Sequence, residues 1–246
     1  MSAGRSEGGD ASPPPSAAVR VGGLIRFSTT DWPGRLAAVL FLQGCPWHCG
    51  YCQNPHLLPM RGEHEEDWDA TLAWLETRRG LLDAVVFSGG EPTAQPGLAP
   101  AIRAVRALGF AIGLHTGGAY PRRLAEAVGD VDWVGFDIKA ASVDYAGVTG
   151  TRSSGIAAFA SLDIVRRAGV PVEFRTTVHP DVTSPAMLMA LARELAELGI
   201  TRWVLQQFRP IGCASDALVA AAPRGARIGD DLLAGLAVHV PEIVVR

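Results

Sequence analysis

We predict that the 246-residue chain folds as an α/β protein, a partial (β/α)6 barrel of parallel strands covered by helices. Three observations predict this fold. Short apolar runs rich in β-forming residues alternate with stretches of helical spacing, as in parallel β-α units. Glycines after the helical stretches, such as Gly109 and Gly169, mark where helices end. Six units are present, and because eight close a full barrel, six favour an open or partial TIM-like one.

The predicted strands follow one another along the chain as short, β-rich runs. They are Ala38–Leu42, Ala84–Ser88, Ala111–His115, Trp133–Asp137, Val172–Val178 and Trp203–Gln207. The predicted helices are the stretches between them, Trp68–Arg79, Leu98–Leu108, Arg122–Val128, Ile156–Ala168 and Pro185–Leu198. In the last helix Leu188, Leu191 and Leu195 recur at helical spacing, and Gly199 follows as a C-terminal cap.

Composition and charge exclude several classes of protein. The net charge is −3 and no basic stripe is present, which argues against nucleic acid as a partner. The longest apolar stretch, near Leu36–Leu42, is far shorter than the ~20 residues of a membrane span. Residues 1–20 are predicted to be a disordered Gly/Ser/Pro/Ala tail, followed by a single domain over residues 21–246. The tail lacks the apolar centre of a secretory signal, so we expect a cytoplasmic protein with reduced cysteines.

Three of the four cysteines lie within eight residues, in the string GCPWHCGYCQNP. Cys45, Cys49 and Cys52 form a C-x-x-x-C-x-x-C pattern, and thiolates this close are expected to converge on one metal centre. An iron–sulfur cube usually takes four cysteines, so three suggest a cube with one iron open to a substrate or cofactor. A structural zinc site with His48 or His56 as fourth ligand is the alternative, although zinc sites usually use paired C-x-x-C units.

Further polar residues stand near the carboxyl ends of the predicted strands, where the reactive groups of such folds gather. They are Ser88, Gly89, Gly90 and Glu91 at the second strand, Thr116 at the third, Asp137 and Lys139 at the fourth, Arg175 in the fifth and Gln206 in the sixth. Two glycines let the backbone approach a ligand closely, and Glu91 adds a carboxylate. Arg175 lies in a mainly buried strand, so we expect it to pair with a carboxylate. The cluster predicts an active site along one rim.

The cysteine spacing, with Tyr51 before the last cysteine, resembles the signature of the radical S-adenosylmethionine (SAM) superfamily. The resemblance implies that the three thiolates hold three irons of a [4Fe–4S] cluster while SAM chelates the fourth. It implies that Ser88, Gly89, Gly90 and Glu91 cradle the methionine ammonium of SAM through a charge-assisted hydrogen bond. Activating enzymes of the glycyl-radical class carry a D-[IL]-K triplet, here residues 137–139, that contacts SAM or its surroundings. Thr116, Arg175 and Gln206 complete the expected cofactor site.

Longer segments of the chain resemble one particular group within this superfamily. FSTTDWPGRLAAVLFLQGC, GGEPTAQ, DIKA, YAGVTG, EFRTTVHP and LQQFRP together are similar to the activating proteins of anaerobic ribonucleoside-triphosphate reductase. The similarity runs from about residue 22 to about residue 210, and the pyruvate formate-lyase activators are related. It implies an enzyme that reductively cleaves SAM at the cluster and generates a glycyl radical on a partner enzyme, with electrons from a flavodoxin or ferredoxin.

Three other functions are compatible with the same residues. A pyruvate formate-lyase-type activase uses the same chemistry on another partner. A radical SAM enzyme acting on a small molecule, such as a 7-carboxy-7-deazaguanine synthase, has similar size and cysteines. A non-catalytic zinc-binding module, the third, is expected to purify colourless, with zinc and without iron.

One position departs from the family pattern. Members typically read D-T-N-G where this chain has His115-Thr116-Gly117-Gly118, and in pyruvate formate-lyase activators that aspartate helps to ligate a monovalent cation. An imidazole does not replace a hard anionic oxygen, which argues against a cation site here. Cys213 lies far from the other cysteines in sequence and is expected to be a lone buried or incidental thiol.

Overall fold

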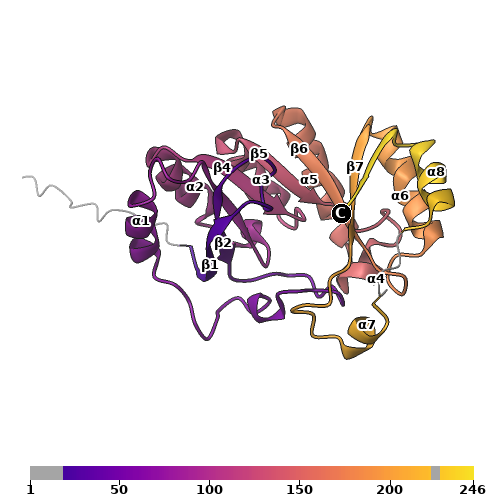
Figure 1. The fold of residues 1–246 in the computed structure, drawn as a ribbon, viewed down its shortest axis with the longest axis horizontal. Coiled ribbons are helices and arrows are strands. Elements are labelled where there is room, and N and C mark those ends of the chain that lie inside the picture. The colour runs from indigo at the N-terminus through magenta and orange to yellow at the C-terminus, as the bar shows by residue number, and fades with distance from the viewer. Residues whose placement is uncertain (1–18, 223–227) are drawn as a thin grey trace, which may run out of the picture.

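The computed structural model describes residues 19–222 and 228–246. The tail predicted over residues 1–20 lies outside the described residues except for Val19 and Arg20, and Val19 is buried in the core. The described residues form one eight-stranded sheet whose strands are hydrogen-bonded in sequence order, from β1 to β8. Figure 1 shows this order, with β1 and β2 at one end of the molecule and β7 near the other.

The strands of this sheet confirm the predicted fold class. They are β1 (Val21–Ser28), β2 (Ala37–Leu42), β3 (Ala84–Gly89), β4 (Ala111–Thr116), β5 (Trp133–Asp137), β6 (Val172–Val178), β7 (Arg202–Gln207) and β8 (Glu242–Val245). All neighbours from β2 to β8 are parallel, whereas β1 runs antiparallel to β2. The six predicted strands are β2 to β7, each within one residue of its expected bounds at either end.

The two edge strands, β1 and β8, were not predicted. In β1, two glycines, Gly22 and Gly23, and three consecutive exposed residues at 25–27 interrupt the alternation that marks a strand. Its pairing with β2 also shifts register twice. β8 has only four residues, none of them buried. The edges β1 and β8 are not paired with each other, so the barrel is open.

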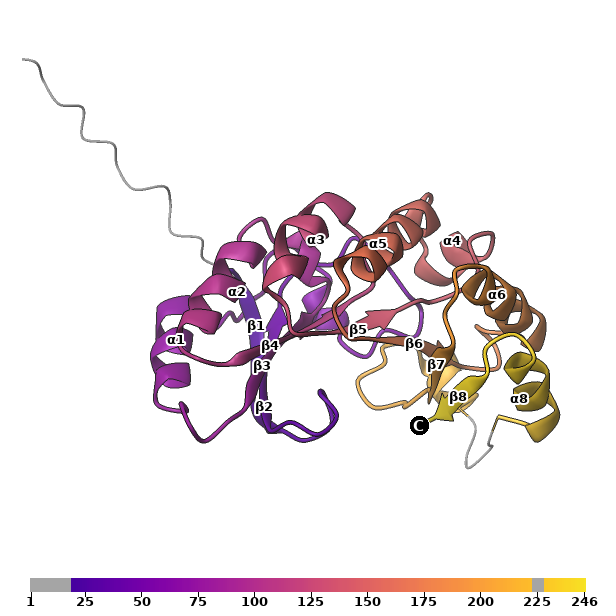
Figure 2. The ribbon, with the colours of Figure 1, turned by 90° about the horizontal axis from the view of Figure 1, so that it is seen from above.

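The described helices connect consecutive strands. They are α1 (Trp68–Glu76), α2 (Leu98–Ala107), α3 (Pro121–Ala127), α4 (Tyr145–Thr149), α5 (Ser154–Ala168), α6 (Pro185–Glu197), α7 (Asp216–Ala220) and α8 (Asp230–Ala237). Five of them, α1, α2, α3, α5 and α6, were predicted; α4, α7 and α8 are short and were missed. Figure 2 shows α1, α2, α3, α5, α6 and α8 along one face of the curved sheet. None of the described helices has the length and hydropathy of a membrane span.

Local sequence explains the helices that cover the sheet. In α2, buried Leu98, Ile102 and Val105 recur at the spacing that brings side chains onto one helix face. Burial of each such aliphatic side chain contributes about 2 kcal/mol to folding. At α6, the Ser184 side chain accepts a hydrogen bond from the Met187 backbone N–H, which satisfies one of the unpaired donors at the helix start.

The two faces of the sheet carry different side chains because residues alternate along each strand. On β3, Val85 and Phe87 belong to the main core under the helices. Val86 on the same strand lies in a smaller cluster on the opposite, concave face. Two tryptophans, Trp32 and Trp133, stack in that cluster with ring centroids 5.5 Å apart. This cluster fills the concave face near the amino ends of the strands.

Candidate functional site

The concave face is apolar near the amino ends of the strands and polar near their carboxyl ends. On β3 to β7, the residues that alternate with the main core include Ser88, His115, Asp137, Arg175 and Gln206. Neighbouring strands are paired so that Asp137 lies beside Arg175 and Thr177 beside Gln206. The alternation and register of the sheet therefore bring together five residues that are far apart in sequence.

The three clustered cysteines lie in residues 43–54, a segment that we call the cysteine loop, between β2 and a 3-10 turn at Pro55–Leu57. Several backbone bonds hold it: for example, Gly44 N–H donates to Leu57 O at 2.8 Å and Cys45 N–H to Leu58 O at 3.1 Å. Cys52 N–H donates to Cys49 O at 3.0 Å. All three thiols are free and partly exposed. The loop thus presents three thiols from a fixed backbone.

The glycine turn, Gly89–Glu91, packs directly on the cysteine loop. Glu91 N–H donates to Gly44 O at 2.9 Å. A Cβ atom at Gly90 would come within 2.6 Å of Gly44 O and 2.8 Å of Leu57 O, so glycine is needed for this close approach. The two sequence motifs therefore form one unit.

The Glu91 carboxylate is buried and holds this unit against the end of β4. Its Oε1 accepts hydrogen bonds from Thr93 N–H at 3.0 Å, Thr93 Oγ1 at 2.6 Å and Thr116 Oγ1 at 2.6 Å, while Oε2 accepts from Gly117 N–H at 2.9 Å. Glu91 and Thr116 are thus hydrogen-bonded to each other on the buried side of the glycine turn and fix its position.

Burial raises the pKa of the Cys45 thiol to about 12, and the nearby Glu91 charge acts in the same direction. Burial also raises the pKa of Cys49, against the opposing charge of Lys139. Because metal binding removes the thiol proton, these groups release protons when they take up metal. A metal or cluster bound at this loop is therefore expected to be lost at low pH.

Lys139 lies over the cysteine loop, with Nζ 5.8 Å from the Tyr51 ring centroid and 5.9 Å from that of Trp47. Burial alone would lower its pKa, but Tyr51, Cys49 and Asp137 outweigh burial and hold the pKa of Lys139 well above its usual value. Lys139 therefore stays charged beside the thiols and favours their thiolate forms.

Asp137 and Arg175 form an ion pair on the concave face, with Arg175 Nε 2.8 Å from Asp137 Oδ1. Burial works to raise the pKa of Asp137, but the charges of Arg175 and Lys139 outweigh it and hold the pKa below its usual range. The carboxylate predicted for Arg175 is thus supplied by the chain itself. Lys139 is not ion-paired with Asp137, despite their proximity in sequence.

His115 lies between this ion pair and the loop that follows β1. Its Nε2 lies 2.7 Å from the Asp31 carbonyl oxygen, which only accepts, so Nε2 carries the hydrogen. Nδ1 then accepts from Ser88 Oγ at 3.4 Å. Arg175 Nη1 lies 3.3 Å from Nε2, but both are donors in this tautomer, so the contact is not a hydrogen bond. The imidazole therefore links β3 and β4 to the Asp31 loop.

A His115→Gln variant is expected to lose less stability in acid than the wild type. Burial, reinforced by Arg175, lowers the pKa of His115 from 6.5 to about 3. Between these values the unfolded chain binds more protons than the folded one, so folding stability falls as the pH falls. At about 1.4 kcal/mol per pKa unit, the wild type should lose a few kcal/mol more than the variant. Urea unfolding at pH 7 and near pH 4 measures this; equal losses would contradict it.

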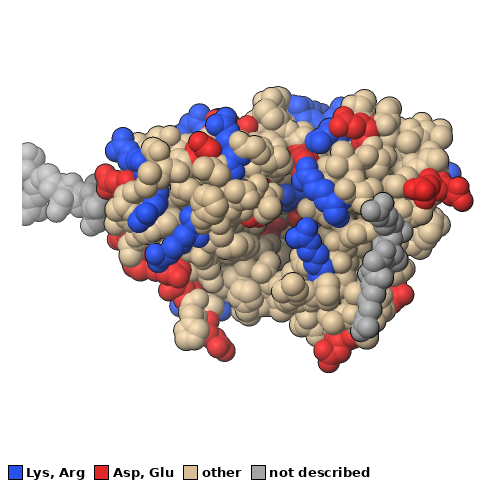
Figure 3. Space-filling view, in the orientation of Figure 1, with Lys and Arg blue, Asp and Glu red and all other residues tan. Residues whose placement is uncertain are grey.

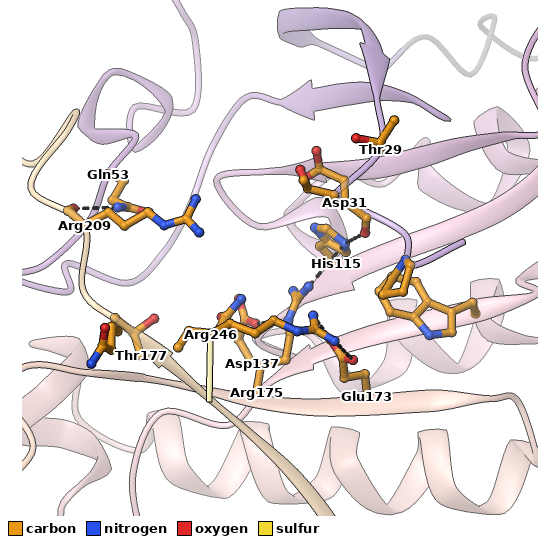
Figure 4. A pocket seen from close by; sticks show the side chains of 15 residues that line it. Thr29, Asp31, Gln53, His115, Asp137, Glu173, Arg175, Thr177, Arg209 and Arg246 are labelled. Carbon is orange, nitrogen blue, oxygen red and sulfur yellow. Dashed lines mark hydrogen bonds and ion pairs between the residues drawn. The ribbon is translucent and has the colours of Figure 1, made fainter. Parts of the chain in front are cut away.

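These residues border a cavity of about 600 Å³ on the concave face. Its lining residues are Thr29, Thr30, Asp31, Pro33, Gln53, His115, Trp133, Asp137, Glu173, Arg175, Thr177, Gln206, Gln207, Arg209 and Arg246. Figure 3 shows a hollow at the middle of this face, with Lys and Arg side chains beside it. Figure 4 shows side chains of β4, β5 and β6, together with Gln53 of the cysteine loop, Arg209 after β7 and Arg246 after β8, around one space. The cavity reaches the cysteine loop at Gln53, the residue after Cys52.

The structure distributes the predicted site residues over three places. Asp137, Arg175 and Gln206 line the cavity, and so does His115, which was not predicted as a site residue. Lys139 lies at the cysteine loop, and Glu91 and Thr116 are buried behind it. The sequence analysis missed several lining residues, among them Asp31, Gln53, Glu173 and Arg246. Glu173 alternates with Arg175 and Thr177 along β6, and this period-2 pattern is the signal that identifies it.

Cys213 is closer to the site than its position in sequence indicated. Its Sγ lies 3.6 Å from the Gly50 carbonyl oxygen, in the middle of the cysteine loop. The neighbouring Gly212 packs against Gln53 so closely that a Cβ atom would overlap the Gln53 oxygen. The thiol of Cys213 is thus free, and it packs on the segment that carries the other three cysteines.

Comparison with known families decides the class of this site. The Radical SAM superfamily matches residues 39–195, a stretch that includes the cysteine loop, the glycine turn and Arg175. The chain belongs to the radical SAM superfamily. It is therefore an enzyme of a class that uses a [4Fe–4S] cluster and SAM, and the zinc-binding alternative is set aside.

Individual radical SAM relatives agree with this assignment. A Methanocaldococcus jannaschii protein named for activation of glycyl-radical enzymes is 29% identical over 197 residues, which cover 77% of this chain and 80% of the relative. The pyruvate formate-lyase-activating enzyme of Clostridium pasteurianum is 31% identical over 170 residues, 67% of this chain and 70% of that one. The crystal structure of QueE from Escherichia coli shares the fold, with a TM-score of 0.57, 16% identity and 93% coverage of both chains.

The cysteine loop fits the radical SAM cluster. Thiolates are the ligands that iron–sulfur clusters take, and three partly exposed thiols lie on one short loop beneath a charged Lys139. Within residues 19–222 and 228–246, no three His, Cys, Asp or Glu side chains converge as ligands of a single metal ion do. The thiolates of a cluster lie farther apart than the ligands of a single ion, because each binds a different iron at a corner of the cube.

Proposed function

We propose that this radical SAM enzyme activates a partner enzyme, anaerobic ribonucleoside-triphosphate reductase, by installing a glycyl radical on it. The relatives named for glycyl-radical enzyme activation and for pyruvate formate-lyase activation support the class of reaction. The segments FSTTDWPGR, YAGVTG and LQQFRP support the choice of partner. A flavodoxin or ferredoxin is the proposed source of electrons.

The observation that carries the proposal is the open cavity beside the cysteine loop. The cavity of about 600 Å³ is polar and adjoins the loop at Gln53. The sheet edges β1 and β8 are not paired with each other, so the barrel does not enclose it. An open site can accept a polypeptide segment with a glycine at its tip, because the residues on both sides of the glycine can leave the cavity. A fully enclosed pocket could not accept such a segment.

Each part of the site has a proposed role. Cys45, Cys49 and Cys52 hold the cluster, and Lys139 stabilises their thiolates. Ser88 and the glycine turn position SAM next to the loop, with Asp137, Arg175 and Gln206 around it, while Thr116 supports the turn through its hydrogen bond to Glu91. When bound, the cluster and SAM together supply the reductive cleavage that yields a carbon-centred radical.

The chain's own contribution is binding, orientation and exclusion of water. Glu91 fixes the glycine turn through its four accepted hydrogen bonds, so the backbone is rigid where SAM is proposed to bind. The stacked Trp32 and Trp133 block the amino end of the concave face and keep water from entering there. No general base is required, because the abstracted group is a hydrogen atom.

The proposal predicts a glycyl radical signal on the partner. Reconstituted enzyme, SAM and a reductant are mixed anaerobically with anaerobic ribonucleotide reductase, and electron paramagnetic resonance should record a glycyl doublet. A partner in which the acceptor glycine is replaced by alanine is the control and should give none. SAM cleavage without a doublet would reject this partner.

Two further mixtures separate the remaining alternatives. A doublet that forms only with pyruvate formate-lyase would assign the enzyme to that partner instead. Cleavage that depends on neither protein, and rises with a 7-deazaguanine precursor, would assign it to small-molecule chemistry.

A further inference from the structure

The charges that line the cavity do not all neutralise one another. Three arginines, Arg175, Arg209 and Arg246, face it together with acidic residues. Arg175 is paired with Asp137 at 2.8 Å, and Arg246 reaches Glu173 at 2.7 and 3.0 Å. These two guanidinium groups are therefore satisfied by carboxylates of the chain itself.

Arg209 differs from the other two. Within the described residues its guanidinium forms no ion pair, and its side chain is exposed. Figure 4 shows it extending from the segment after β7 toward the middle of the cavity. In the free protein, water solvates this charge. A segment that fills the cavity displaces that water, and an uncompensated cation is then costly. Asp31, the remaining carboxylate of the cavity lining, accepts a hydrogen bond from Ser28 and forms no ion pair with Arg209 among the described residues. An anion brought by the occupant would therefore compensate the charge of Arg209.

The backbone of Arg209 is fixed to the cysteine loop. Gln53 Nε2 donates to the Arg209 carbonyl oxygen at 2.6 Å. Four residues later, Cys213 Sγ contacts Gly50 O, and Gly212, with φ of +82°, lies against Gln53. An anion bound by Arg209 is thus held at a set position relative to Cys52, the neighbour of Gln53. Such an anchor fixes which residue of an extended substrate reaches the cofactors.

We propose that Arg209 is a specificity-determining residue that binds a carboxylate of the substrate polypeptide near its acceptor glycine. This inference rests on the proposed function. A guanidinium matches a carboxylate with two parallel hydrogen bonds, which gives direction as well as charge. The carboxylate belongs to an Asp or Glu side chain, or a chain terminus, of the partner.

The test compares Arg209→Gln, Arg209→Lys and a matched control, Arg193→Gln, which removes an exposed arginine from α6 on the helix-covered side. Iron and sulfide content show that each protein holds its cluster. The rate of glycyl-radical formation is then measured against partner concentration and, separately, against SAM concentration.

We expect Arg209→Gln to raise the KM for the partner about tenfold or more while kcat changes little. Arg209→Lys should recover part of the loss, because it keeps the charge without the planar fork. Arg193→Gln should match the wild type. A partner variant with its loop carboxylate replaced by the amide should show the same loss, and combining it with Arg209→Gln should add nothing further.

Two results would overturn the inference. If Arg209→Gln behaves like Arg193→Gln, the guanidinium binds no part of the partner. If the KM for SAM rises instead, the anion belongs to the cofactor. A wild-type enzyme that forms no glycyl radical on any partner would reject the proposed function, and this inference with it.

Discussion

A Cys49→Ala variant is expected to hold no [4Fe–4S] cluster and to cleave no SAM above background. The cysteine loop offers three thiols, and the cluster is expected to use all of them, so removal of one leaves two of its irons without a protein ligand. Iron and sulfide analysis, the visible absorbance of the cluster and release of methionine from SAM measure the effect. The fold should persist, because Cys49 is partly exposed and lies in a loop.

Cys213→Ala is the matched control for this variant. Its thiol packs on the same loop, at Gly50, but lies outside the three-cysteine pattern. It should keep the cluster and its SAM cleavage. If Cys49→Ala retains cleavage, or Cys213→Ala loses the cluster, the ligand assignment is wrong.

A Gly89→Ala variant is expected to lose about 3 kcal/mol or more of its free energy of unfolding. Two effects add at this position. The backbone has φ of +121°, where an alanine is strained, and a Cβ atom would overlap the backbone nitrogen and oxygen of Leu42 on β2. The new methyl group must push β3 away from β2 at the base of the glycine turn. SAM cleavage should fall with stability, since the turn is displaced.

Gly109→Ala separates the two effects. Gly109 also has a positive φ, +96°, but no atom lies within 4 Å of the position its Cβ would take. This control variant should lose about 1 kcal/mol of its free energy of unfolding, because only the backbone strain acts at Gly109. Urea unfolding followed by circular dichroism gives both values. Equal losses in the two variants would show that the overlap at Leu42 is relieved without cost.

The fold could be predicted from the sequence wherever alternation and helical spacing are strong. β2 to β7 were found to within a residue at each end, because their buried apolar runs end at glycines or polar residues. β1 and β8 were missed since edge strands bury little and show no clean pattern. The short helix α4 was missed as well, because five residues do not establish a period.

The candidate site could be predicted in part. Short motifs identified the cysteine loop and the glycine turn, and Arg175 was expected to pair with a carboxylate. The partner itself, Asp137, comes from the pairing of β5 with β6, which no single segment encodes. Gln53, Arg209 and Arg246 meet at the cavity only through the curvature of the whole sheet. Contacts between distant segments are what a single sequence does not reveal.

The strand order has a consequence for assembly of the enzyme. Because β1 to β8 are paired in sequence order, each strand can add to a growing sheet as soon as it is made, since its neighbour is always the strand made just before it. The cavity is the exception, since it joins the Asp31 loop near one edge of the sheet to Arg246 beyond the other edge strand. The sheet can therefore nucleate early in synthesis, whereas the cavity is completed only when β8 docks. Partial chains are then expected to be folded locally but unable to bind a substrate.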